Sequence, residues 1–121
     1  MSEPIPKVVF DCVIFAQAIM NDAGPAGACL QLARARSIHL VWSNYVLAEI
    51  RELPGKIPAR FVVTSDRVEA FILDVAVFAE TIAAVPQVYT NPFDADDSHY
   101  VNLAVAASAT LITSRDRTCW I

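Results

Sequence analysis

The chain has 121 residues, 55% of them hydrophobic, and carries a formal net charge of −4. This length and composition allow a core to form without disulfides or metals, so we expect a single domain over residues 1–121. The negative charge excludes a broad basic surface that binds nucleic acid by counterion release, but it is compatible with an acidic nuclease site that divalent cations neutralise.

The cysteines and the apolar N-terminal segment bear on the cellular compartment. Cys12, Cys29 and Cys119 are odd in number and lack metal-ligand spacing, which indicates a reducing compartment. Asp11 interrupts the apolar start and no convincing small-residue cleavage site follows it, so a strand and a helix fit this segment better than a signal peptide does. No apolar stretch reaches the ~18 residues that a membrane helix needs. We therefore expect a cytoplasmic protein without membrane association.

The first predicted element is a strand over Lys7–Phe10, a continuous apolar run that is typical of a strand buried on both faces. Asp11 follows it directly, and a carboxylate buried at the end of a strand has to be paired, hydrogen-bonded or bound to metal. The alternative is that Asp11 caps a helix over Cys12–Met20, and the two roles can coexist.

The next segment predicts two helices on either side of a second strand. Proline at its start and an alanine-rich composition indicate a helix from Pro25 to about Arg36, and the strand follows at His39–Trp42. The third helix starts at a cap formed by Ser43 or the residue after it. Glu49 lies on that helix near the edge of its apolar stripe, and the alternative role for it is an ordinary solvated glutamate.

The strongest helical periodicity in the chain follows a short segment, 60–64, that is either extended or the entry to the helix. Asp66 and Glu69 make a capping-box-like start, and the apolar spacing predicts a helix from Asp66 to about Ala84. We expect a third strand over Val85–Val88, whose proline indicates either an edge strand or the start of a strand.

The stretch from Asp94 to Asp116 combines carboxylates with a helix and a strand. Asp97 lies at the predicted start of the helix, and the apolar pair after it, Leu111 and Ile112, predicts a strand. Asp116 comes just beyond that strand, at the sheet edge where open α/β folds bind ligands. We expect the helix start and the strand end at opposite edges of the sheet, so that Asp97 and Asp116 meet only if the loop over residues 89–96 crosses the carboxyl edge.

Helices therefore alternate with short apolar strands along the whole chain. This order predicts an α/β fold, a three-layer sandwich around a central, mainly parallel sheet of about four strands. The spacing of the carboxylates within this order resembles that of the PIN-domain nucleases, best known as the VapC-like toxins of bacterial and archaeal toxin–antitoxin pairs. Residues 8–14 (VVFDCVI) resemble the opening strand and first acidic motif of the family, and residues 43–50 (SNYVLAEI) resemble its second. Residues 94–97 (DADD) and 109–116 (ATLITSRD) resemble the third and fourth motifs.

The resemblance implies a metal-dependent endoribonuclease. Asp11, Glu49, Asp97 and Asp116 match the four acidic positions of the family and would hold Mg²⁺ or Mn²⁺, since hard oxygen ligands favour these ions. The expected partners are an RNA substrate and a cognate antitoxin protein. We also expect a homodimer, because the helices over 25–36 and 66–84 carry more apolar surface than one small domain needs.

Three residues after the last predicted strand are candidates for substrate binding. Arg115 and Arg117 could contact a substrate phosphate, although surface arginines more often pair with nearby acids. Ser114 could orient a metal-bound water or make a loop hydrogen bond. The chain differs from the family at Cys12 and Val13, where relatives have threonine and asparagine, and the resemblance places its end at Ile121, before the last strand of the family fold.

Other α/β classes fit the sequence less well. A phosphoacceptor receiver domain needs an acidic pair after its first strand and a late lysine, but Asp11 stands alone and no lysine follows Lys56. A haloacid-dehalogenase-like phosphatase needs an aspartate where this chain has Val13. The alternative that stays open is a catalytically degenerate PIN fold that serves as a binding or assembly module.

Overall fold

A computed structural model describes residues 5–83, 85–86, 95–107, 109 and 111–113 of the chain, with the description of 95–98 and 111–113 limited to the backbone. Its centre is a sheet formed by β1 (Lys7–Phe10), β2 (His39–Ser43), β3 (Glu80–Ile82) and β4 (Leu111–Thr113). These four strands lie in the order β3-β2-β1-β4, and every pairing between them is parallel. The predicted α/β class with a mainly parallel sheet of about four strands is thus confirmed.

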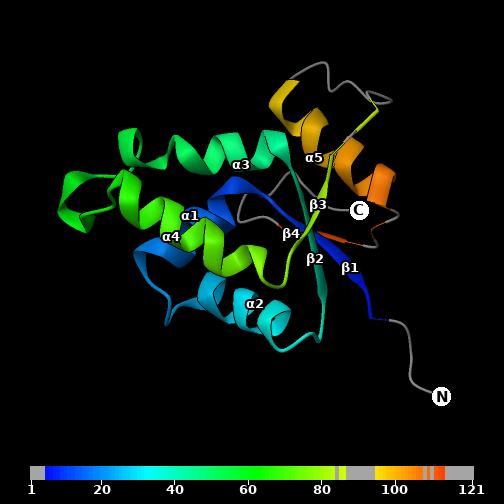
Figure 1. The fold of residues 1–121 in the computed structure, drawn as a ribbon, viewed down its shortest axis with the longest axis horizontal. Coiled ribbons are helices and arrows are strands. Elements are labelled where there is room, and N and C mark those ends of the chain that lie inside the picture. The colour runs from blue at the N-terminus through cyan, green and yellow to red at the C-terminus, as the bar shows by residue number, and fades with distance from the viewer. Residues whose placement is uncertain (1–4, 84, 87–94, 108, 110, 114–121) are drawn as a thin grey trace.

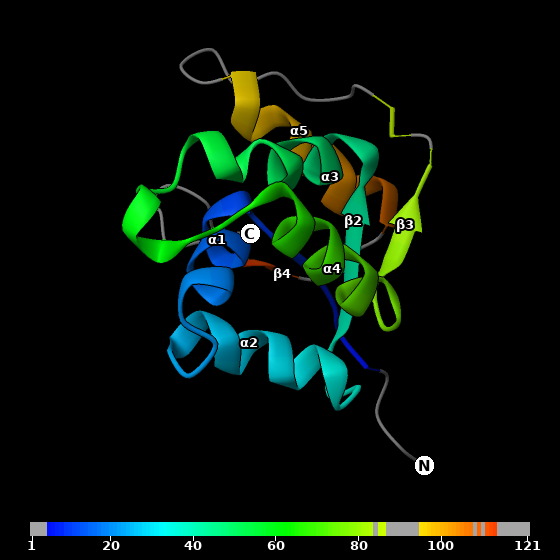
Figure 2. The same cartoon turned by 60° about the vertical axis from the view of Figure 1, so that its left-hand side comes forward.

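Helices cover both faces of this sheet (Figure 1). They are α1 (Cys12–Met20), α2 (Pro25–Arg34), α3 (Asn44–Arg51), α4 (Ser65–Ala76) and α5 (Ala95–Ala107), with short 3₁₀ turns η1 (Leu53–Gly55) and η2 (Ala59–Phe61). α5 packs against all the strands from one side, while α1, α2, α3 and α4 pack on one another on the other side (Figure 2). This arrangement is the predicted three-layer sandwich.

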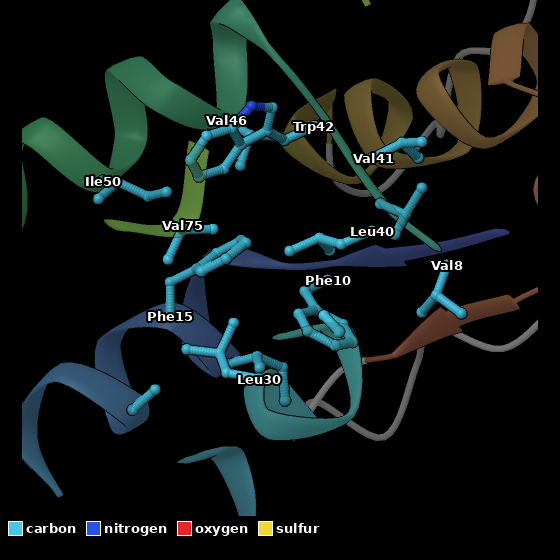
Figure 3. Packing of buried hydrophobic residues seen from close by; sticks show 14 of the residues in the cluster. Val8, Phe10, Phe15, Leu30, Leu40, Val41, Trp42, Val46, Ile50 and Val75 are labelled. Carbon is cyan, nitrogen blue, oxygen red and sulfur yellow. The ribbon is translucent and has the colours of Figure 1, made fainter. Parts of the chain in front are cut away.

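An aromatic cluster forms the core between the sheet and the larger helix layer (Figure 3). The Phe15 ring on α1 lies 5.9 Å, centroid to centroid, from Phe10 on β1 and equally far from Trp42 on β2. Phe15 is completely buried, and the other two rings are at most 2% exposed. Full burial of such side chains is worth about 1.5–3 kcal/mol each, so this cluster is a major reason why α1 is held against the ends of the central strands.

The predicted boundaries of α4 and of the third strand are wrong. The helix ends at Ala76 instead of Ala84, and the strand lies at Glu80–Ile82 instead of Val85–Val88, of which Gln87 and Val88 lie outside the described residues. Helical spacing of apolar residues continues past Ala76 because Phe78, on the turn, is buried in the same core. The observed strand lies at an edge of the sheet but contains no proline, and the Trp42 indole N–H donates to the Thr81 hydroxyl at 2.8 Å across the strand pair.

Local side-chain hydrogen bonds explain where several helices begin. The Ser43 hydroxyl accepts from the Val46 N–H at 3.3 Å and caps α3, as expected. α4 starts one residue earlier than predicted, because Thr64 rather than Asp66 is its cap and accepts from the Arg67 N–H at 3.2 Å. The segment before it is a 3₁₀ turn and not an extended strand, and it ends at Val62 with a positive φ of 53°.

Within the part of the chain that the structure describes, no helix has the length and apolar character needed to cross a membrane.

The α2 helix is packed very closely at its start against the preceding loop. A Cβ atom added at Gly27 would lie only 1.9 Å from the Asp22 carbonyl oxygen. Glycine is therefore required here for close packing, since Gly27 has no positive φ.

We predict that Gly27→Ala destabilises the protein by about 1–3 kcal/mol, the usual cost of overpacking a closely packed position, although alanine is the better helix former. Gly55→Ala is the matched control, because a Cβ there meets nothing within 4 Å. It should leave the stability unchanged or raise it by about 0.4–1 kcal/mol. Urea unfolding of both variants measures the difference, and equal stabilities would contradict the packing argument.

Candidate functional site

The carboxyl ends of the parallel strands bring several predicted site residues to one edge of the sheet. Asp11 directly follows β1, and β4 is aligned with β1 so that Thr113 pairs with Phe10. The carboxyl end of β4 therefore lies at the same edge of the sheet as Asp11. Ser114, Arg115 and Arg117, together with Asp116, lie outside the described residues, so their roles stay predictions.

Asp11 is buried, with an exposed fraction of 7%, and caps α1. Its carboxylate oxygen Oδ1 accepts a hydrogen bond from the Ile14 N–H at 3.2 Å. The helix-cap alternative for this residue is thus confirmed, and the cap fixes the carboxylate at the end of β1. A role in metal binding is compatible with this geometry and stays a prediction.

Glu49 is connected to the same edge through Tyr100. The Tyr100 hydroxyl donates a hydrogen bond to Glu49 Oε1 and accepts one from the backbone N–H of Cys12 at 3.1 Å. Glu49 is half-buried on α3, so it is not an ordinary solvated helix glutamate. This bridge joins α3, α5 and the start of α1, and it brings Glu49 close to the residue that follows Asp11.

The electrostatics of this group reflect burial beside negative charge. Burial first, then the charge of Glu49 and less strongly that of Asp11, raise the pKa of the Cys12 thiol from 9.0 to about 12. Burial and then the hydrogen bond to Glu49 also raise the pKa of the Tyr100 hydroxyl well above its usual value. Cys12 is therefore protonated at neutral pH and is not a nucleophile, since only a thiolate attacks readily.

Tyr100 also locates the start of α5. Asp97 precedes Tyr100 by three residues, within one helical turn, so the backbone of Asp97 lies at the carboxyl edge together with Asp11 and Glu49. The expectation that the helix start and the strand end lie at opposite edges is wrong. A helix that returns between parallel strands runs antiparallel to them, and so it starts at the edge where the strands end.

The described donors are of the kind that a hard divalent cation requires. Asp11 and Glu49 offer carboxylate oxygens, which favour Mg²⁺ or Mn²⁺ over softer metals. Among the residues whose side chains are described, no three His, Cys, Asp or Glu form a group that could hold a metal. The side chains of the two further predicted ligands, Asp97 and Asp116, are not among those described. The described pair therefore fits a hard cation in donor type and supplies part of the predicted ligand set.

Sequence reasoning missed the part played by Tyr100. The residue is 5% exposed, and a buried tyrosine hydroxyl usually has a hydrogen-bond partner. Its position one turn after Asp97, in a chain whose other acidic motifs converge, was the available signal.

A model of the PIN domain matches residues 7–118, nearly the whole chain. No curated protein and no solved structure gives a significant match. The matched region contains Asp11, Glu49 and Tyr100, and it also includes the segments that carry Asp97 and Asp116.

We predict that Tyr100→Phe lowers the free energy of unfolding by about 1–3 kcal/mol, because the Cys12 N–H and the Glu49 carboxylate both lose a partner in a poorly solvated place. Urea unfolding of Tyr100→Phe, Glu49→Gln and the double variant forms a thermodynamic cycle. The coupling between the two sites should be about 0.5–3 kcal/mol, as for directly interacting residues. Strictly additive effects would show that the bridge contributes nothing to stability.

Proposed function

The chain belongs to the PIN-domain family, a family of nucleases, and we propose that it is a metal-dependent endoribonuclease that hydrolyses RNA phosphodiester bonds. The observation that carries the proposal is the Tyr100 bridge, which holds Glu49 at the sheet edge where Asp11 lies. Asp11 and Glu49, which are separated by 38 positions in the sequence, thus lie at the same edge of the sheet. This arrangement supports a shared metal site.

Asp11 and Glu49 would hold Mg²⁺ or Mn²⁺ together with Asp97 and Asp116. A cation bound there would polarise the phosphoryl oxygen and lower the pKa of a bound water, and thereby supply the nucleophile and neutralise developing charge. The carboxylates of the chain would hold the cation, and without it they would repel the phosphodiester. Tyr100 acts as a positioning residue, because its hydroxyl limits the directions in which the Glu49 carboxylate can face.

Ser114, Arg115 and Arg117, in the segment that follows β4, complete the proposed site. Arg115 and Arg117 would contact the substrate phosphate, where a guanidinium can donate two parallel hydrogen bonds. Ser114 would orient a water at the cation. These roles are supported by the position of β4, which ends at the same edge of the sheet as β1. In the sequence, Ser114 is the first residue after β4 and Asp116 is the third.

The cellular role that we propose is that of the toxin of a toxin–antitoxin pair, VapC-like, with the whole chain as one PIN domain and a cognate antitoxin as partner. This proposal rests on the resemblance of the acidic motifs to that branch of the family. The alternative is a degenerate PIN fold that serves as a binding or assembly module. Metal binding separates the two, because only the nuclease needs a cation at Asp11 and Glu49.

The apolar surface of the larger helix layer supports the proposed homodimer. Leu73 and Val77 lie one turn apart on α4 and are 71% and 75% exposed, and Leu32 on α2 is 50% exposed. The Arg34–Asp74 ion pair at 2.6 Å ties α2 to α4, so the helices that carry these side chains are neighbours. An apolar surface of this kind is a candidate for association.

The decisive test of the nuclease is the effect of Asp97→Asn on metal-dependent stability. The change removes one negative charge from a crowded group, so the metal-free protein should be as stable as the original or more stable. Thermal stabilisation by Mg²⁺ or Mn²⁺ and cleavage of RNA should both fall sharply, because a ligand is lost.

Glu49→Gln should have the same effect on cation binding, and Glu52→Gln is its matched control. Glu52 lies three residues away, is exposed, and pairs with Lys56 at 3.1 Å on the surface. The control should change stability by at most about 1 kcal/mol and leave metal-dependent cleavage intact. If Asp97→Asn instead destabilises the metal-free protein and leaves the response to metal intact, Asp97 is only a helix-terminal residue and the nuclease proposal fails.

For the homodimer, we predict that sedimentation velocity at micromolar concentration shows a dimer that Leu73→Glu converts to a monomer. A charge at that position would be buried without a partner in the interface, at a cost of several kcal/mol. Val105→Glu on α5 is the control, since Val105 is 58% exposed on the opposite side of the sheet and should leave the dimer unaffected. A monomer before any substitution would contradict the proposal.

A further inference from the structure

A small cavity of about 210 Å³ lies beside the carboxylate group at the same edge of the sheet. It is bounded by the start of α3, the end of β3 and the first half of α5, and its lining includes Ser43, Asn44, Tyr45, Ile82, His99 and Asn102. Pockets for drug-sized ligands are usually about 300–1,000 Å³, so this one suits a smaller group.

A parallel pair of rings forms one wall of the cavity. The rings of Tyr45 and His99 stack with their centroids 3.6 Å apart and an angle of 11° between their planes. Tyr45 also meets the edge of Tyr100, with the centroids 6.5 Å apart and an interplanar angle of 82°. Since Tyr100 donates to Glu49, this wall continues directly into the carboxylate group.

The cavity lies one strand away from Asp11. The register that pairs Val9 with Val41 continues to Asp11 and Ser43, each of which follows or ends its strand and caps the next helix. Neighbouring strands are about 4.8 Å apart, so the cavity begins within about 5–10 Å of Asp11 along the edge. That separation is of the order of one nucleotide step.

The chemistry of the lining suits a neutral, planar and polar group. The residues that line the cavity in the described part of the chain include no Asp, Glu, Lys or Arg. They include the side-chain amides of Asn44, which is exposed, and Asn102, which is only 1% exposed. Rings that stack and amides that donate and accept hydrogen bonds are the features by which proteins bind single-stranded bases.

We propose that this cavity binds one nucleobase of single-stranded RNA, next to the phosphate that is cleaved. The base extends the stack of His99 and Tyr45, and its edge faces the amide of Asn44. The site thus selects for single-stranded RNA and for particular bases near the cleavage position. This inference rests on the proposed nuclease function for its substrate, but the binding can be measured without cleavage.

The test uses equilibrium binding of short, labelled single-stranded RNAs, measured by fluorescence anisotropy with Ca²⁺ in place of Mg²⁺. One series replaces each nucleotide in turn by an abasic one. His99→Ala should weaken binding of the intact RNA by roughly tenfold to hundredfold, the usual effect of losing a stacking ring. For the RNA that is abasic at the stacked position, His99→Ala and the unsubstituted protein should have the same affinity, because there is no base for the ring to stack on.

Three further variants control this experiment. His99→Phe keeps a stacking ring and should retain most of the affinity. Val105→Ala changes an exposed side chain on α5 that does not line the cavity, and should bind like the unsubstituted protein. Asn44→Ala should alter the preference among the four bases more than the affinity for the best one. Circular dichroism checks that each variant is folded.

Failure of the cavity and failure of the nuclease give different results. If binding depends on the base in this pattern but Mg²⁺-dependent cleavage is absent, the base-binding proposal stands and the nuclease proposal is overturned. If metal-dependent cleavage is insensitive to His99→Ala, and an abasic nucleotide weakens binding equally at every position, the nuclease proposal stands and the base-binding proposal is overturned. The absence of any RNA binding would overturn the cavity as well.

Discussion

The hydroxyl of Tyr100 is the contact on which the arrangement of the acidic site depends. It accepts a hydrogen bond from the backbone N–H of Cys12, where β1 passes into α1, and donates one to Glu49 on α3. One oxygen atom of α5 is thus hydrogen-bonded both to the junction of β1 with α1 and to α3. Because that oxygen is buried, neither partner can turn to water without leaving a polar group unsatisfied, which makes the arrangement specific.

Charge is distributed unevenly over the molecule. The ion pairs of Arg34 with Asp74, Arg51 with Glu69, and Lys56 with Glu52 engage carboxylates on exposed helix surfaces. The raised pKa of the Cys12 thiol, by contrast, reports burial next to the Glu49 and Asp11 charges. In the proposed nuclease, a cation at the acidic edge would take the place of the missing solvent, whereas most surface ion pairs contribute little to stability.

Much of the fold follows from local patterns in the sequence. The strand at Lys7–Phe10 and the helix at Cys12–Met20 have the predicted bounds, because a continuous apolar run and a capping aspartate act within a few residues. The position of β3 does not follow from such patterns, since its residues continue the helical spacing of α4 and are placed by pairing with β2. Asp11 and Glu49 could be named from motif spacing. The tyrosine that links Glu49 to the backbone of Cys12, the residue after Asp11, lies 51 positions after Glu49, and its place depends on how α5 packs on the sheet.

One face of the sheet has a single helix on it in the described part of the chain, and that helix carries much of the site. α5 contributes Tyr100 to the bridge and His99 to the ring stack, and it contains Asp97 in its first turns. Detaching α5 would therefore dismantle the acidic site and the base cavity together, while the aromatic core on the other face keeps its contacts. If the chain is the nuclease that we propose, an inhibitor of it need not resemble a nucleotide or chelate a metal. A peptide that competes for the place of α5 on the sheet would inactivate it without entering either pocket.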